Sequence, residues 1–266
     1  MAATRTQAPL LRIETSSGAA AWRALQWDTH QFGISAARLE ALDASGFYRE
    51  ARAEKSTLLA LVLNECHSAG VRYLTARVDA GDLTSIHSLE EAGFELIDGI
   101  QTFLLSINGN HSSPPPDARL FRPSDMTDVL EIARTAFVFD RFHADPSLAP
   151  EVADRVNEDW TRNCCLGAAA DAVLVAEEEG CVVSYVTCRI DRGARHGVVI
   201  LVATAPAARG KGAGRRASAA ALHWFSNQGA ATVEVGTQLR NVPAARLYES
   251  LGFRMHRTSL TFRKLL

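Results

Sequence analysis

Hydrophobic residues recur with two different periods along this chain of 266 residues, and the periods predict its elements. Apolar positions three or four residues apart, which is the spacing of one helical face, predict helices over 149–163, 214–228 and 242–251. Short apolar runs bounded by turn residues predict strands over 172–177, 181–191, 197–204 and 232–237. The run over 197–204 is continuously apolar, so we expect a central strand that is buried on both faces. The pattern predicts a mixed α/β fold in which helices flank a sheet.

The clearest interruption of this pattern is the segment 106–118, which reads S-I-N-G-N-H-S-S-P-P-P-D-A. Three consecutive prolines with Gly, Ser and Asn cannot continue a helix or a central strand. We therefore predict an amino-terminal domain over 1–108, a Pro/Ser-rich linker over 109–118 and a carboxy-terminal domain over 119–266.

A weak internal repeat relates the two predicted domains. With a shift of 159 residues, 57–103 lies over 216–262 without a gap, and eight of 47 positions are identical. Gly70 and Gly229 each end an apolar-periodic helix, and Gly93 and Gly252 each end the next helix before a phenylalanine. The repeat predicts that both halves share one order, helix–strand–helix–strand–strand, and one fold. The alternative is that helix–strand repeats resemble one another by chance.

The positions that differ between the halves carry the candidate chemistry. The segment Val202–Gly214, V-A-T-A-P-A-A-R-G-K-G-A-G, predicts a strand that enters a glycine-rich turn and then a helix. Such a turn presents backbone N–H groups and the positive end of the helix dipole to a pyrophosphate, and Arg209 and Lys211 add charge. Residues 50–55 of the other half, E-A-R-A-E-K, have no glycine and two carboxylates, which would repel a pyrophosphate. We infer that the amino-terminal half cannot bind this ligand.

Two familiar phosphate-binding motifs do not fit the turn. The P-loop pattern G-x-x-x-x-G-K-[S/T] is absent from the sequence, and no βαβ unit precedes the turn as a Rossmann fingerprint requires. A purely structural glycine turn is the remaining alternative.

The turn and the segment after it resemble a known family. Residues 209–214 fit [Q/R]-x-x-G-x-[G/A], and 241–253 fit N-x-x-A-x-x-x-Y-x-x-x-G-F, which are motifs of the GNAT acyltransferase superfamily. The resemblance implies a GNAT fold in the carboxy-terminal half, a degenerate GNAT-like amino-terminal half and acetyl-CoA as co-substrate. It further implies that the cofactor contacts Val202, Ala203, Thr204, Arg209, Gly210, Lys211, Gly212, Ala213, Gly214, Asn241 and Arg246.

The resemblance also implies a general acid. Tyr248 matches the family tyrosine that protonates the departing thiolate, and a phenol with a pKa near 10 suits that leaving group. Its counterpart in the repeat is Leu89, which has no proton to give. The strand over 197–204 has no carboxylate to act as general base, and only His196 lies at its start. The favoured alternatives to a side-chain base are a chain of water molecules that removes the proton from the amine, or an amine that is already neutral when it binds.

Several patches are similar to a narrower group, the TDP-fucosamine acetyltransferase type. They include W-D-T-H-Q-F-G at 27–33, Trp160 and V-G-T-Q at 235–238. This resemblance implies N-acetylation of a dTDP-linked 4-amino-4,6-dideoxy sugar for polysaccharide biosynthesis. The segment R-F-H-A-D-P at 141–146 would then contact the acceptor through Arg141, Phe142 and His143. An ordinary loop is the alternative for this segment.

Composition limits the other classes of function. The net charge is −2 without a long basic run, so we expect no nucleic-acid partner. The longest apolar runs are too short to cross a membrane, and five cysteines form no C-x-x-C pair, so we expect a soluble cytoplasmic protein. Scattered histidines predict no metal site. The sequence does not decide between a monomer and a homodimer. It also leaves two alternatives for the function, which are another amine acceptor (aminoglycoside, amino acid or protein) and a non-catalytic acetyl-CoA-binding module.

Overall fold

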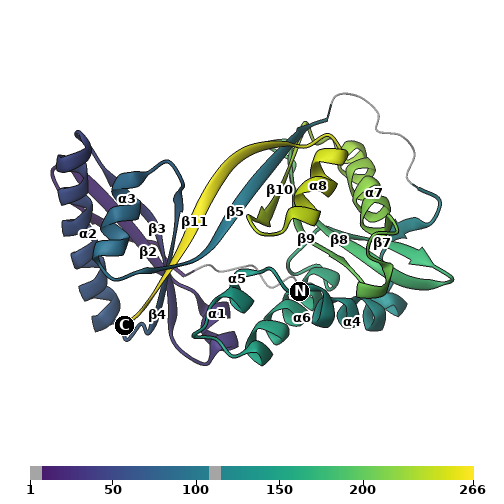
Figure 1. Ribbon diagram of the computed structural model, residues 1–266, viewed down its shortest axis with the longest axis horizontal. Coiled ribbons are helices and arrows are strands. Elements are labelled where there is room, and N and C mark those ends of the chain that lie inside the picture. Colours follow the sequence, from purple (N-terminus) through teal and green to yellow (C-terminus); the bar gives the residue numbers. More distant parts are fainter. Residues whose placement is uncertain (1–7, 108–114) are drawn as a thin grey trace. The chain divides into compact units, whose positions relative to one another are not determined.

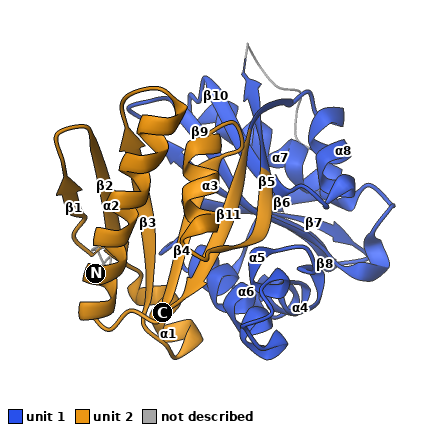
Figure 2. Ribbon diagram, turned by 60° about the vertical axis from the view of Figure 1, so that its left-hand side comes forward, with its two compact units in different colours: residues 1–3, 101–257 blue, residues 4–100, 258–266 orange. Residues whose placement is uncertain are grey.

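The computed structural model describes residues 8–107 and 115–266, and within it the chain forms two compact units (Figure 2). Gln101–Arg257 belongs to unit 1, whereas the described residues 8–100 together with Thr258–Leu266 belong to unit 2. The greater part of the last strand of the sequence thus belongs to the amino-terminal unit. Most of the predicted linker, residues 109–114, lies outside the described residues, and the predicted domain boundaries stay a prediction.

Unit 2 is a sheet covered on one face by two helices (Figure 1). Its elements are β1 (Leu11–Glu14), β2 (Gly18–Ala24), α1 (Gln26–Phe32), β3 (Ala36–Ala44), α2 (Tyr48–Ser68), β4 (Tyr73–Asp79) and α3 (Leu83–Glu91), followed by the start of β5 (Glu95–Ser106). The strand order is β1-β2-β3-β4-β11, in which β11 is the strand Arg254–Leu265, and β3 and β4 run parallel. Apolar residues of α2 and α3, such as Leu58, Val62 and Leu89, pack onto Leu39 and Leu74 of the strands.

Unit 1 has the strand order β5-β10-β9-β8-β7-β6. Its elements are β6 (Ala118–Leu120), a 3₁₀ turn (Pro123–Asp125), α4 (Met126–Ala136), α5 (Arg141–Ala144), α6 (Pro150–Cys165), β7 (Ala172–Glu178), β8 (Cys181–Asp191), β9 (His196–Thr204), a 3₁₀ turn (Pro206–Ala208), α7 (Ala213–Asn227), β10 (Thr232–Gln238), α8 (Val242–Ser250) and the start of β11 (Arg254–Leu265). This is the mixed α/β architecture predicted from the sequence.

The sheet of unit 1 is covered on both faces. Alternate residues of β7 show this arrangement, because Leu174 and Ala176 pack in the cluster that contains α7. Val173 and Val175 instead pack in the cluster that contains α4 and α6. Strand residues point alternately to opposite faces, so α7 covers one face and the pair α4 and α6 covers the other.

The internal repeat is confirmed at the level of whole elements. Adding 159 to the bounds of β4, α3 and β5 gives the bounds of β10, α8 and β11, and α2 and α7 end at equivalent residues. One detail of the prediction was wrong, since the two strands expected after α3 and after α8 are in each case one continuous strand of twelve residues. The helices α2 and α7 also begin differently: α2 starts at Tyr48, six residues earlier than the start of α7 predicts.

Candidate functional site

The candidate cofactor site of unit 1 begins where two parallel strands stop pairing. β9 and β10 pair from His196 with Thr232 to Val199 with Val235. At this point β9 has a bulge, because Val199 and Leu201 face consecutive residues of β8 and Ile200 is the extra residue. The bulge reverses the alternation of side chains, so Val199 packs with α7 whereas Leu201 packs with α4 and α6.

The prediction that β9 is fully buried on both faces was wrong. The strand is alternately buried and half-buried along its whole length. Beyond the bulge, Ile200–Thr204 continues along β8 past the segment that pairs with β10. Val202, Ala203 and Thr204, the predicted cofactor contacts on this strand, all lie in this continuation.

The glycine turn leads directly into α7, as predicted. Gly210 and Gly212 have φ values of 75° and 83°, which lie in the left-handed region that glycine adopts without strain. Gly212 is the N-cap of α7, and no side chain caps this helix. A Cβ on Gly214 would lie 3.0 Å from Oγ1 of Thr204, so a glycine lets the helix start close to the end of β9. A helix start without a side-chain cap leaves its first N–H groups without an acceptor from the N-cap side chain.

The charged residues of the turn have different surroundings. Arg209 donates from Nη2 to the carbonyl of Ala136 at 2.9 Å and from Nε to the carbonyl of Thr204 at 3.4 Å. Lys211 is exposed and has no ion-pair partner among the residues that the structure describes. Arg216, which sequence reasoning missed, donates to the carbonyl of Lys211 at 3.2 Å and pairs with Asp117 and Glu178. Arg216 thus holds the turn in place, whereas Lys211 is available to a ligand.

α8 carries the three predicted residues of the second motif. Asn241 is the N-cap and accepts from the N–H of Ala244 at 3.3 Å. Arg246 is exposed. Tyr248 is 5% exposed, and its ring centroid lies 5.8 Å from that of Phe103 and 6.0 Å from that of Phe253. Burial raises the pKa of the Tyr248 phenol, so it stays protonated at neutral pH.

The predicted acceptor residues lie together in α5. The guanidinium of Arg141 lies 4.4 Å above the ring of Phe142, which is itself buried. In His143, Nδ1 lies 2.7 Å from Oδ2 of Asp140, and Nε2 lies 3.0 Å from Oδ1 of Asp154. The ring of Phe142 therefore packs against the guanidinium of Arg141, and His143 joins α5 to α6.

His196 lies at the paired end of the two strands. Its Nδ1 is 2.9 Å from Oγ1 of Thr232, and its pairing with β8 reaches Asp191. Four residues of extended chain, about 13 Å, separate it from the bulge at Ile200. This position does not favour His196 as the base that serves the candidate site.

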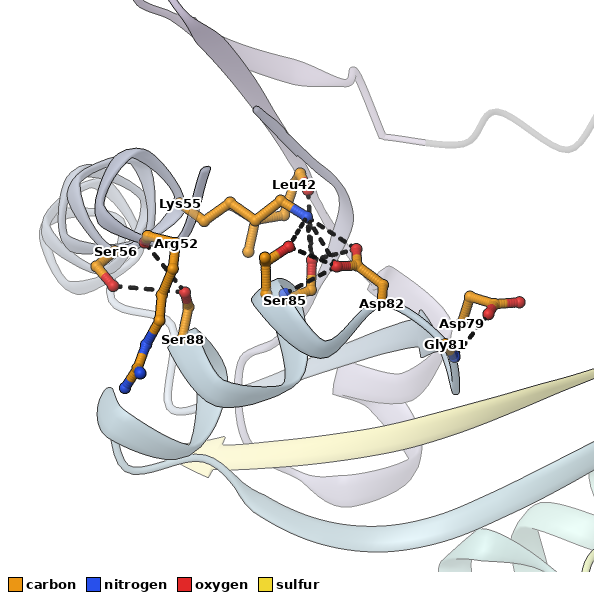
Figure 3. Close-up of polar contacts among 10 residues, drawn as sticks. Leu42, Arg52, Lys55, Ser56, Asp79, Gly81, Asp82, Ser85 and Ser88 are labelled. Atoms are coloured by element: carbon orange, nitrogen blue, oxygen red, sulfur yellow. Dashed lines mark hydrogen bonds and ion pairs between the residues drawn. The ribbon is translucent and has the colours of Figure 1, made fainter. Parts of the chain in front are cut away.

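The equivalent region of unit 2 is built differently (Figure 3). Residues 50–55, which the repeat places over the glycine turn, are part of the continuous helix α2. Lys55 takes the position of Gly214, and its buried Nζ donates to Asp82 at 2.8 and 3.0 Å, to Thr84 at 2.9 Å and to Ser85 at 2.8 Å. Because the N–H groups of this segment lie within a helix, unit 2 has no cradle of the kind seen in unit 1.

Two further features concern the classes of function that the sequence disfavoured. Among residues 8–107 and 115–266, no three His, Cys, Asp or Glu residues are grouped so that they could hold a metal ion. No helix in the same part of the chain combines the length and the apolar character that crossing a bilayer requires.

Comparisons with known proteins agree with this geometry. Residues 127–253 match the model of the Acetyltransferase (GNAT) family. The spore coat polysaccharide biosynthesis protein SpsD of Bacillus subtilis (strain 168) is 31% identical over 185 residues, which are 68% of this chain and 62% of that protein. The dTDP-fucosamine acetyltransferase of Escherichia coli O6:H1 is 27% identical over 69% of this chain and 78% of that protein.

A solved structure supports the fold of the whole chain. The GCN5-related N-acetyltransferase from Sphaerobacter thermophilus superposes with a TM-score of 0.63 at 15% identity, over 92% of this chain and 76% of that one. The predicted GNAT fold, including a GNAT-like amino-terminal half, is confirmed.

Proposed function

We propose that this chain, whose residues 127–253 match the model of the Acetyltransferase (GNAT) family, transfers the acetyl group of acetyl-CoA to a primary amine of a nucleotide-linked amino sugar. The observation that carries the proposal is the opening between β9 and β10, which has the glycine turn at one side and Tyr248 on the helix after β10. The names of the relatives, a dTDP-fucosamine acetyltransferase and a polysaccharide biosynthesis protein, support a sugar acceptor of the dTDP-4-amino-4,6-dideoxyhexose type.

Acetyl-CoA is held by the elements on both sides of this opening. Its pyrophosphate binds the N–H groups of the turn over 209–214, with Lys211 as the available cation. The pantetheine arm lies along Val202, Ala203 and Thr204, whose backbone continues past the paired part of β9. Asn241 and Arg246 contact the cofactor from α8.

The reaction is a direct acyl transfer. The neutral amine attacks the thioester carbonyl, and the strand N–H groups stabilise the oxyanion. The C–S bond of the tetrahedral intermediate then breaks, and Tyr248 gives its proton to the departing thiolate. The nitrogen loses its extra proton to water, and solvent returns a proton to the phenolate.

The acceptor is held from α5. Arg141 binds the diphosphate of the nucleotide sugar, since a guanidinium matches phosphate oxygens with two parallel donors. Phe142 keeps the guanidinium in place by the contact at 4.4 Å, and His143 fixes α5 to α6 through Asp140 and Asp154.

The test is release of the coenzyme A thiol in the presence of acetyl-CoA and a panel of amines, with chromatography of the products. We expect turnover with dTDP-4-amino-4,6-dideoxy sugars and none with aminoglycosides, amino acids or peptides. Turnover only with one of the other amines would contradict the acceptor. Titration calorimetry should give one acetyl-CoA per chain, and binding without turnover on any amine would identify a non-catalytic binding module.

A further inference from the structure

The connection between α4 and α5, residues 137–140, is held at its backbone by arginines from two other elements. Arg240 donates from Nη2 to the carbonyls of Phe139 at 3.2 Å and Asp140 at 3.5 Å. Arg209 donates to the carbonyl of Ala136, the last residue of α4. Arg209 follows β9 and Arg240 follows β10, so each arginine comes from one side of the opening described above.

Asp140 joins this connection to the helices that follow it. It is the N-cap of α5, and its Oδ1 accepts from the N–H groups of Phe142 at 2.8 Å and His143 at 3.1 Å. Its Oδ2 accepts from Nδ2 of Asn157 on α6 at 3.1 Å and lies 2.7 Å from Nδ1 of His143. The connection, α5 and α6 therefore form one hydrogen-bonded block, and a displacement of Asp140 displaces α5 as a whole.

Arg240 links this block to α8. It directly precedes Asn241, the N-cap of α8, so its backbone is fixed by the start of that helix. Tyr248 lies seven residues farther along the same helix, which corresponds to about 10 Å. The carbonyls of Phe139 and Asp140 are thus tied through a single side chain to the helix that carries Tyr248.

We propose that Arg240 is a positioning residue that sets the place of the acceptor-binding segment Arg141–His143 relative to Tyr248. The inference rests on the proposed function, which puts the acceptor at this segment. Both hydrogen bonds come from one nitrogen, Nη2, and the planar guanidinium fixes the directions of its two N–H groups, whereas a lysine ammonium rotates about its stem. The arrangement predicts that loss of Arg240 weakens acceptor binding and leaves the acetyl-CoA contacts intact.

The kinetic test uses Arg240→Ala and Arg240→Lys in the full chain, with the best acceptor of the amine panel. We expect Arg240→Ala to raise KM for the acceptor about tenfold or more, the size expected for lost hydrogen bonds from a charged donor, and to leave KM for acetyl-CoA within about twofold. Arg240→Lys should recover part of the loss. The control is Arg192→Ala, which removes an arginine from the turn after β8 that donates to Gln228. In this control, KM for the acceptor and KM for acetyl-CoA should both stay unchanged. An equal rise of both constants in Arg240→Ala would overturn the inference.

A second readout needs no acceptor. Hydrogen–deuterium exchange of the amides of 137–143 should be faster in Arg240→Ala than in the natural protein and intermediate in Arg240→Lys. Unchanged exchange would overturn the inference, whether or not any amine is a substrate. Failure of the proposed function would instead appear as absence of acetyl-CoA binding or turnover in the natural protein, so the two failures can be told apart.

Discussion

In each unit two parallel strands pair over a short segment and then separate, but the residues next to the separated strands differ between the units. β3 and β4 pair from Ala36 with Tyr73 to Leu39 with Ala76, four positions, as do β9 and β10. In unit 1 the helix that follows the first strand begins late, behind a glycine turn. In unit 2 it begins six residues earlier, and Lys55 reaches Asp82 at the start of α3 (Figure 3).

What remains of the opening in unit 2 is a cavity of about 250 Å³. It is lined by the ends of β3 and β4 together with Asp82 and Ser85. Asp82 corresponds to Asn241, and each is the N-cap of its helix. The same backbone position therefore supplies an ion-pair partner in one unit and a neutral amide in the other. The difference shows that the same fold can form with a glycine turn or with an internal ion pair at this position.

The largest expected effect comes from the position at which the units differ most in chemistry, Tyr248 against Leu89. Tyr248→Phe should lower kcat by about 10²- to 10⁴-fold, the usual contribution of a positioned acid, and leave acetyl-CoA affinity nearly unchanged. Stopped-time assays and calorimetry with the same preparation measure both. The control is Tyr73→Phe, which removes a buried phenol from unit 2 and should leave turnover unchanged. A collapse of acetyl-CoA affinity in Tyr248→Phe would contradict the assigned role.

The ion pair of unit 2 should matter for stability rather than for turnover. Lys55→Met leaves Asp82 without its cation, and we expect a loss of about 2–3 kcal/mol in the free energy of unfolding, the lower end for such pairs because Asp82 is partly exposed. Urea unfolding at pH 7 measures this loss. The double variant with Asp82→Asn should recover part of it, and an additive loss in the double variant would exclude coupling.

The same pair has a predicted pH dependence. Burial alone would raise the pKa of Asp82, but hydrogen bonds from Lys55, Ser85 and Thr84 outweigh it, so the pKa lies well below the usual range. The stabilisation is therefore present above the unfolded pKa near 3.9 and is lost as the pH falls toward the folded pKa. Unfolding free energies at pH 7 and pH 3 should differ more in the natural protein than in Lys55→Met.

The smallest expected effect concerns glycine. Gly212→Ala places a Cβ at a φ of 83° and should lower the free energy of unfolding by about 1–2 kcal/mol. Gly70→Ala in unit 2 is a matched change, because Gly70 has a φ of 71° and open space around its Cβ position. We expect similar losses of stability in urea unfolding, but weaker acetyl-CoA binding only in Gly212→Ala. Equal acetyl-CoA affinity in both variants would argue against the turn as the pyrophosphate site.

Much of the fold could be predicted from local signals. Gly70, Gly93, Gly229 and Gly252 all have positive φ values directly after helices, as their spacing indicated. Left-handed helix ends are a property of single residues, so a linear pattern reveals them. The absence of glycine in 50–55 likewise predicted the missing cradle of unit 2. By contrast, the bulge at Ile200 has no signal in a continuous apolar run, because it depends on the register with β8.

The sequence by itself determined the elements, the repeat and the motif that identifies the family, because each rests on residues close together in the chain. Only the tertiary structure decided the partners of the charged residues. Lys55 and Asp82 are 27 residues apart, and Arg240 and Phe139 are 101 residues apart. It also placed the greater part of the last strand in the amino-terminal unit. Such contacts depend on which segments the sheet brings together, because a polar side chain forms hydrogen bonds with the groups that the fold places next to it.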